Sequence, residues 1–201
     1  MVTSDSWRRI NPDRVHWAEG EEARVAGGAA TPAGKRCFDL VVASVGLIAL
    51  APVMGLIAAA VRMDSRRPVL YRARRMGQNG REFACLKFRI MTDEERVTRV
   101  GAWLRRHGLD ELPQLVNVLR GEMSVVGPRP VMARDRADPP MRHYRRLEMQ
   151  PGMTGMWAAQ DIDCGASTAY VSQEEMYRRC WSPWLDLKIM ARSAAAALTG
   201  A

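Results

Sequence analysis

Two adjacent carboxylates, Asp110 and Glu111, stand at the start of a predicted helix and precede a Gly-Pro-Arg-Pro turn at residues 127–130. The helix is expected at residues 111–120, because apolar side chains recur there with i, i+3, i+4, i+7 spacing and Pro113 falls in the first turn. Asp110 is therefore expected at or near the N-cap, where free backbone N–H groups and the helix dipole favour phosphate. A carboxylate there can also hold Mg²⁺ together with substrate phosphates. The pair indicates phosphoryl transfer, although capping is the commoner role of such an aspartate.

Three basic residues could hold the phosphate. Lys87 lies in an expected strand, and Arg105 stands shortly before the carboxylates. Arg129 lies between two prolines, which restrict the backbone and favour a guanidinium held ready for bidentate contact with a phosphate. Lys87 could instead cover a sheet edge with its aliphatic stem, and Arg105 could be half of a solvated pair with Arg106.

Ordered motifs run through most of the chain, from around Lys35 to around Met190. They are Lys35-Arg36-Cys37-Phe38-Asp39, Pro52, Arg75-Met76-Gly77 with Gly80 and Phe83, Lys87-Phe88-Arg89, Thr98-Arg99-Val100-Gly101, residues 109–130, Pro151-Gly152-Met153-Thr154-Gly155 and Trp184-Leu185-Asp186-Leu187-Lys188-Ile189. Together they resemble the bacterial sugar transferase family, the monotopic polyprenyl-phosphate phosphoglycosyl transferases that begin the assembly of exopolysaccharide, O-antigen and glycoprotein glycans.

The resemblance implies transfer of a sugar 1-phosphate from a UDP-sugar to undecaprenyl (polyprenyl) phosphate, with release of UMP. It implies that Asp110 is the nucleophile, carries the phosphosugar covalently and binds Mg²⁺, with Glu111 as its dyad partner. It places Lys87, Arg105 and Arg129 at active-site positions, where they would bind the substrate phosphates. It also implies contact with membrane lipids on the cytoplasmic face of the bacterial inner membrane, and it leaves a homodimer as one assembly to test.

The chain departs from the family pattern at three places. Ala73 replaces a frequent Gln, Ile90 replaces a usual Ser or Thr, and Met-Trp-Ala-Ala-Gln at residues 156–160 replaces the usual Gln-Val/Ser-Gly-Arg run. Because the carboxylate pair and the three cations are intact, these changes put substrate choice in doubt more than catalysis. The alternative function is a catalytically impaired, membrane-bound interaction protein of the same fold.

The composition agrees with one basic, membrane-associated domain. The chain has 201 residues and a formal net charge of +8, which suits an anionic membrane face, phosphorylated substrates or nucleic acid. The absence of zinc-finger spacing and RNP-type aromatic motifs argues against nucleic acid. The four cysteines form no Cys-x-x-Cys pair and the three histidines are scattered, so free thiols in a reducing cytosol are expected instead of a zinc site.

An apolar run at residues 40–61 is the expected membrane element. It is longer than the roughly 18 apolar residues typical of a spanning helix. Lys35 and Arg36 precede the run and three arginines follow it, so the positive-inside rule places both ends in the cytoplasm. Pro52 interrupts the run, which predicts a re-entrant helix kinked at this proline, with a single spanning anchor as the alternative. Asp39, just before the run, could pair with Arg36 at the interface.

The predicted fold is α+β and mainly helical, with the re-entrant membrane helix, a small β-hairpin, catalytic helices and C-terminal interfacial helices. Strands are expected at residues 69–71 and 83–88, joined around Gly77 to Gly80. Tryptophans and cations alternate with aliphatic residues near the C-terminus, which favours an interfacial helix or an amphipathic core helix. Further helices are expected at residues 97–107 and 142–148, and a charged loop at residues 133–140.

Three segments follow from this reading. Residues 1–34 form a weakly ordered tail, because the segment ends in a run rich in glycine and alanine. Residues 35–62 form the re-entrant membrane helix. Residues 63–201 form the cytoplasmic catalytic domain.

Overall fold

The computed structural model describes residues 31–65, 67–92, 96–132, 147–158 and 173–199. The predicted loop at residues 133–140, most of the predicted helix at residues 142–148 and nearly all of the N-terminal tail lie outside these ranges. The elements are α2 (Ala33–Asp64), β1 (Leu70–Met76), η3 (Gln78–Gly80), β2 (Glu82–Phe88), α3 (Arg99–Arg106), η4 (Leu109–Glu111), α4 (Gln114–Leu119), β3 (Ser124–Val126), β4 (Val131–Met132), β5 (Gly152–Thr154), α6 (Gln173–Cys180) and α7 (Pro183–Thr199).

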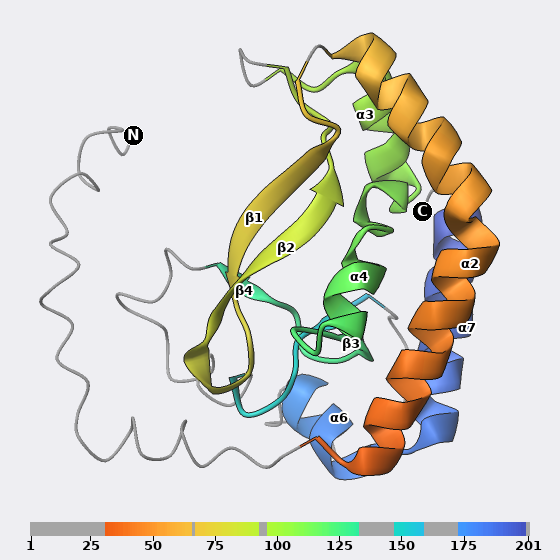
Figure 1. The fold of residues 1–201 in the computed structure, drawn as a ribbon. Helices are drawn as coiled ribbons and strands as arrows, with labels where there is room; N and C mark the ends of the chain where they lie inside the picture. The colour runs from red at the N-terminus through yellow and green to blue at the C-terminus, as the bar shows by residue number, and fades with distance from the viewer. Residues whose placement is uncertain (1–30, 66, 93–95, 133–146, 159–172, 200–201) are drawn as a thin grey trace, which may run out of the picture.

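The mixed helical and β fold is arranged in three layers (Figure 1). The β1–β2 hairpin forms one outer layer, α3 and α4 lie in the middle, and the long helix α2 runs along the other side with α7 beside it. The middle layer therefore contacts both the hairpin and α2, and α4 packs against both of them.

The predicted hairpin is confirmed, with a longer first strand than expected. Strands β1 and β2 are antiparallel and pair from Leu70 with Phe88 to Met76 with Glu82. Asn79 and Gly80 adopt positive φ angles in the connecting turn, a conformation that Gly and Asn tolerate best. The short strand β4 extends this sheet in the order β2-β1-β4.

The predicted helix at residues 97–107 is confirmed as α3, whose N-cap Thr98 accepts a hydrogen bond from Gly101 N. The predicted helix at residues 111–120 is wrong at its start. Gly108 turns the chain with a positive φ, a 3₁₀ turn follows over Leu109–Glu111, and α4 begins only at Gln114. Asp110 lies in that turn and not at the N-cap of α4, because the left-handed glycine and Pro113 divide the segment into two short helices.

A second sheet, which the sequence did not predict, pairs β3 and β5 in parallel over residues far apart in the chain. It forms part of the main core, where Val118, Met123, Val126 and Ile189 are fully buried. The core thus joins α4, β3 and α7 into one body.

Helix α2 packs against this body along one face. Asp39 and Ala43 near its start are buried, and Ile57 and Val61 near its end pack with Phe88 and Leu104 in a second cluster. Its other side is apolar and exposed, as at Ile48 (78% exposed) and Leu56 (73%). Among the described residues, this helix alone is long and apolar enough to cross a membrane. The helix continues through Pro52, so the re-entrant path and the kink stay predictions.

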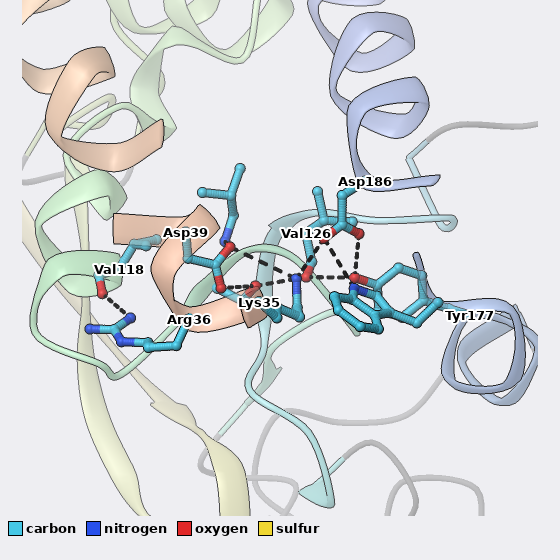
Figure 2. A network of polar contacts seen from close by, with 10 residues as sticks. Lys35, Arg36, Asp39, Val118, Val126, Tyr177 and Asp186 are labelled. Atoms are coloured by element: carbon cyan, nitrogen blue, oxygen red, sulfur yellow. Dashed lines mark hydrogen bonds and ion pairs between the residues drawn. The ribbon is translucent and has the colours of Figure 1, made fainter. Parts of the chain in front are cut away.

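The two basic residues before the apolar run, whose charges in the sequence served only to orient the helix, face the protein. Lys35 is buried, with its ammonium 2.9 Å from Asp186 Oδ2 on α7 and 3.8 Å from Asp39 Oδ1. Arg36 donates to the carbonyl oxygens of Val118 (2.7 Å) and Leu119 (3.0 Å), where it complements the negative end of α4 (Figure 2).

The possible pair of Asp39 with Arg36 does not form. Asp39 instead accepts hydrogen bonds from Ser124 Oγ (2.7 Å) and Val125 N (3.0 Å). Asp186 accepts from Tyr177 (2.6 Å), and burial together with the Asp186 charge raises the pKa of the Tyr177 hydroxyl, so it remains a donor. Two buried carboxylates thus share one buried ammonium, and the network joins α2, β3, α6 and α7 (Figure 2).

Replacing that ammonium should destabilise the whole body. We expect Lys35→Met to lower the free energy of unfolding by about 3 kcal/mol or more, because it leaves two buried carboxylates without a cation. Thermal unfolding in detergent measures the effect. Lys188→Met is the matched control, since Lys188 is exposed on α7; equal melting temperatures for the two variants would contradict this prediction.

Candidate active site

A cavity of about 260 Å³ opens between the hairpin, the η4–α4 segment and the loops after β3 and β5. Three of its lining residues, Lys87, Glu111 and Arg129, were predicted as site residues. Its full lining is Arg75, Cys85, Lys87, Glu111, Gln114, Arg129, Pro130, Val131, Met132, Gly152, Met153 and Trp157. Three of these residues are cationic and one is anionic, so the cavity suits a ligand with negative charge.

Lys87 and Glu111 form an ion pair and a hydrogen bond at the cavity wall. Lys87 comes from β2 and Glu111 from the η4 turn, and both side chains are partly exposed. Lys87 therefore does not merely cover a sheet edge. The pair ties the strand to the turn that carries Asp110.

Asp110 is buried, with 6% of its surface exposed, and it is not among the residues that line the cavity. Burial raises the pKa of its carboxyl above the usual value and the Glu111 charge adds to this, whereas Lys87 and then Arg105 lower it. Asp110 thus lies within electrostatic reach of three of the predicted site residues. Its neighbour in the chain, Glu111, lines the cavity, so the backbone of the η4 turn holds Asp110 next to the cavity wall.

The two predicted arginines are placed differently. Arg105 is exposed on α3 and does not line the cavity, although its charge acts on Asp110. Arg129 is exposed at the cavity, and its guanidinium carbon lies 5.0 Å from the centre of the Trp157 ring. No carboxylate among the described residues pairs with Arg129, so its donors remain available to an anion.

The sequence prediction missed Arg75, Cys85, Gln114 and Trp157 as cavity residues. Arg75 and Cys85 belong to the hairpin, where strand alternation could have placed them on one face with Lys87. Burial raises the pKa of the Cys85 thiol to about 11. At neutral pH the thiol is therefore an uncharged part of the cavity wall and a poor nucleophile. No local signal could have placed Trp157 beside Arg129, because the two come from separate loops.

Asn117 connects the two walls of the cavity. Its side-chain oxygen accepts from Leu86 N (2.9 Å), and its amide nitrogen donates to Ala84 O (2.8 Å) and Glu122 Oε2 (2.6 Å). The Asn117 amide, on helix α4, thus forms hydrogen bonds with backbone groups at the free edge of β2. Strand β2 is the one that carries Lys87.

The carboxylates fit the way in which Mg²⁺ is usually bound beside phosphates. The described residues contain no group of three or more His, Cys, Asp or Glu that could hold a metal by themselves. Mg²⁺, however, commonly takes one or two carboxylates and completes its shell with substrate phosphates and water. Asp110, with Glu111 next to it, offers that limited set of ligands.

The chain matches the family model described as bacterial sugar transferase over residues 30–200. It is 43% identical over 185 residues to the undecaprenyl-phosphate glucose phosphotransferase of Komagataeibacter xylinus, covering 78% of this chain and 34% of that protein. It is 36% identical over 197 residues to the exopolysaccharide production protein ExoY of Rhizobium meliloti (strain 1021), covering 83% of this chain and 87% of that protein.

A third relative is the UDP-glucose:undecaprenyl-phosphate glucose-1-phosphate transferase of Escherichia coli (strain K12). It is 37% identical over 183 residues, which cover 78% of this chain and 38% of that protein. The chain therefore spans little more than a third of the two glucose-phosphate transferases, but most of ExoY.

The Asn117 bridge generates a stability prediction. We expect Asn117→Ala to lower the free energy of unfolding by about 1–3 kcal/mol, because buried backbone groups of β2 lose their partners. Thermal unfolding measures this loss. Arg120→Ala is the control, because it removes an exposed side chain next to the same helix; an equally small loss in both variants would show that the bridge contributes little.

Proposed function

The chain belongs to the bacterial sugar transferase family, and we propose that it transfers a sugar 1-phosphate from a UDP-sugar to undecaprenyl phosphate, releasing UMP. The Escherichia coli relative is named for the transfer of glucose 1-phosphate from UDP-glucose to undecaprenyl phosphate, the Komagataeibacter xylinus relative is named an undecaprenyl-phosphate glucose phosphotransferase, and ExoY is named for exopolysaccharide production. We place this protein at the first membrane step of exopolysaccharide or related glycan synthesis. The sugar is left open.

The observation that carries the proposal is the meeting of Lys87, Glu111 and Arg129 at one cavity beside the buried Asp110. These residues come from a strand, a 3₁₀ turn and a loop. They combine two phosphate-binding cations with a carboxylate pair, which is the set of groups that phosphoryl transfer through an enzyme-bound intermediate needs. The departures at Ala73 and Ile90 lie outside the cavity lining, whereas Trp157, which belongs to the departure at residues 156–160, is part of it. The intact carboxylate pair and the three cations favour catalysis over the alternative of an impaired interaction protein.

The proposed reaction has two displacements at one phosphorus. A carboxylate oxygen of Asp110 attacks the β-phosphorus of the UDP-sugar, and the bond from that phosphorus to the bridging oxygen breaks, so that UMP leaves with the electron pair. A phosphate oxygen of undecaprenyl phosphate then attacks the same phosphorus, and the carboxylate of Asp110 is released. The product is undecaprenyl diphosphate carrying the sugar.

The neighbouring residues support these steps by their charge. Lys87 and Arg129 bind the diphosphate oxygens, where negative charge builds up during each displacement. Arg105 acts from the surface on Asp110 and favours its charged form. Glu111 holds Lys87 in place and, with Asp110, would hold Mg²⁺, whose charge offsets that of the phosphoryl oxygens.

We further propose that the protein lies on the cytoplasmic face of the inner membrane without crossing it. Both ends of α2 pack against the same body, through Asp39 with Ser124 at the start and Val61 with its cluster at the end. The opposite side of the helix is apolar and exposed. A helix held in this way can place its free side against lipid while both of its ends stay on one side of the membrane.

Asp110→Asn should abolish UMP release, because an amide is a poor nucleophile and a weak metal ligand. The wild-type protein, incubated with a UDP-sugar and Mg²⁺ but no acceptor, should gain the mass of a phosphosugar on the peptide that contains Asp110. The Asn variant should gain none. Glu82→Gln is the control, because it changes a carboxylate on the hairpin outside the cavity lining. Near-normal turnover by the Asn variant would overturn the assignment, and a panel of UDP-sugars in the same assay would identify the sugar.

Arg129→Lys should slow turnover about thirtyfold, which corresponds to roughly 2 kcal/mol of transition-state stabilisation, because an ammonium cannot reproduce two parallel hydrogen bonds. Its melting temperature should stay close to that of the wild type, since Arg129 is exposed. Arg74→Lys on β1, where the arginine pairs with Glu82 at the surface, is the matched control. Near-normal activity in a destabilised Arg129→Lys protein would assign this arginine a structural role instead.

The membrane arrangement predicts that both ends of α2 are reached from the same side. Two proteins that each keep a single cysteine test this. One keeps the exposed native Cys37, and the other carries Met63→Cys in place of a methionine that is 89% exposed. A maleimide that cannot cross membranes should label both in inverted vesicles and neither in intact cells. Labelling from opposite sides would show that the helix crosses the membrane.

A further inference from the structure

The loops that follow β3 and β5 meet at the edge of the cavity. The two strands are parallel, with Ser124 opposite Gly152 and Val126 opposite Thr154, so their C-terminal ends lie at the same edge of the sheet. The loop after β3 carries Arg129, and the turn after β5 carries Trp157. Both side chains line the cavity.

Close backbone packing fixes these two loops against one another. Gly127 N donates to Thr154 O, and Gly152 N donates to Pro128 O, both at 2.9 Å. A Cβ on Gly155 would lie 2.2 Å from Gly127 O and 2.7 Å from the indole nitrogen of Trp157. Glycine is therefore required where the indole lies against the backbone, and the position of the ring relative to the Arg129 loop is set by the fold.

The indole contacts the Arg129 loop at two points. Its Nε1 donates to Gly127 O at 3.3 Å, and the guanidinium carbon of Arg129 lies over the ring at 5.0 Å from its centre. An aromatic face attracts the cation without occupying its N–H donors, unlike a carboxylate, which would accept hydrogen bonds from them. The ring thus holds the side chain while its donors stay free for a ligand.

We propose that Trp157 is a positioning residue, whose indole holds the Arg129 guanidinium over the cavity so that its donors face the diphosphate of the nucleotide sugar. This inference rests on the proposed phosphate-binding role of Arg129. It assigns to Trp157 an effect on diphosphate binding that acts only through the arginine.

A double-mutant cycle on the full-length protein in detergent tests the proposal. Trp157→Leu, Arg129→Ala and the double variant are compared by the Kd for UDP from calorimetry and by kcat and KM for UMP release. We expect Trp157→Leu to weaken UDP binding roughly tenfold in the presence of Arg129, and to cause little further loss when Arg129 is already alanine. Trp157→Phe, which keeps an aromatic face, should retain most of the affinity.

The matched control is Trp184→Leu. Trp184 has the same kind of contact, with Lys188 Nζ 5.7 Å from its ring centre on α7, but it does not line the cavity. This variant should bind UDP with wild-type affinity. Trp157→Met, whose unbranched side chain can adapt to the space left by the indole, replaces the leucine variant if the latter does not fold.

The outcomes separate this inference from the proposed function. If Trp157→Leu lowers the affinity for UDP equally with and without Arg129, the tryptophan has a structural role and the inference is overturned. Normal UDP binding by Trp157→Leu, with impaired binding by Arg129→Ala, would overturn the inference and leave the proposed function intact. Normal binding by Arg129→Ala would overturn the phosphate-binding role of that arginine, and the positioning role of Trp157 with it.

Discussion

The structure depends on the sharing of one buried ammonium by two buried carboxylates. Lys35 at the start of α2 lies against Asp186 of α7 and near Asp39 of its own helix. Buried charges are tolerated only when they are paired and hydrogen-bonded, and here Ser124, Val125 and Tyr177 supply the additional donors. Because those partners come from different elements, the charges can be satisfied only when α2, β3, α6 and α7 meet in one arrangement.

Helix α4 connects these elements to the cavity. Arg36 binds the carbonyl groups at its C-terminal end, Leu115 and Val118 pack in the core, and Asn117 reaches the edge of β2. The turn with Asp110 and Glu111 directly precedes the helix. The residues that fix α2 to the body therefore also fix the carboxylates relative to Lys87, and a short helix of six residues is positioned by contacts along its whole length instead of by its own stability.

Two chemically different surfaces result from this construction. One side of α2 is exposed and apolar, and the cavity with its cations lies between the hairpin and the middle layer. A lipid-linked phosphate and a water-soluble nucleotide sugar make different demands on a protein surface, because the first is held in a bilayer and the second is a solvated anion. In the proposed function, the apolar side of α2 lies against the bilayer that holds the lipid-linked acceptor, and the phosphate of that acceptor and the nucleotide sugar meet at the basic cavity.

The sequence by itself determined the features that depend on near neighbours or on recognisable motifs. The hairpin and α3 follow from strand alternation, turn residues and a capping threonine, all within a few residues of one another. The motifs around Asp110 and Arg129 indicated the family, and three of the five predicted catalytic and phosphate-binding residues line the cavity, with Asp110 and Arg105 close enough to interact electrostatically.

The tertiary structure decided what depends on residues far apart in the chain. Lys35 and Arg36 resemble membrane-flanking charges in sequence, yet their partners lie 151 and 82 residues away. Other contacts also join residues that are distant in the chain. They are the parallel pairing of β3 with β5, the hydrogen bonds of Asn117 to β2 and the contact of Trp157 with Arg129. Hydrophobic periodicity and local spacing report only which face of an element is buried. Several distant residues could each serve as the partner of a buried charge or an aromatic ring. Packing in three dimensions decides which of them does so.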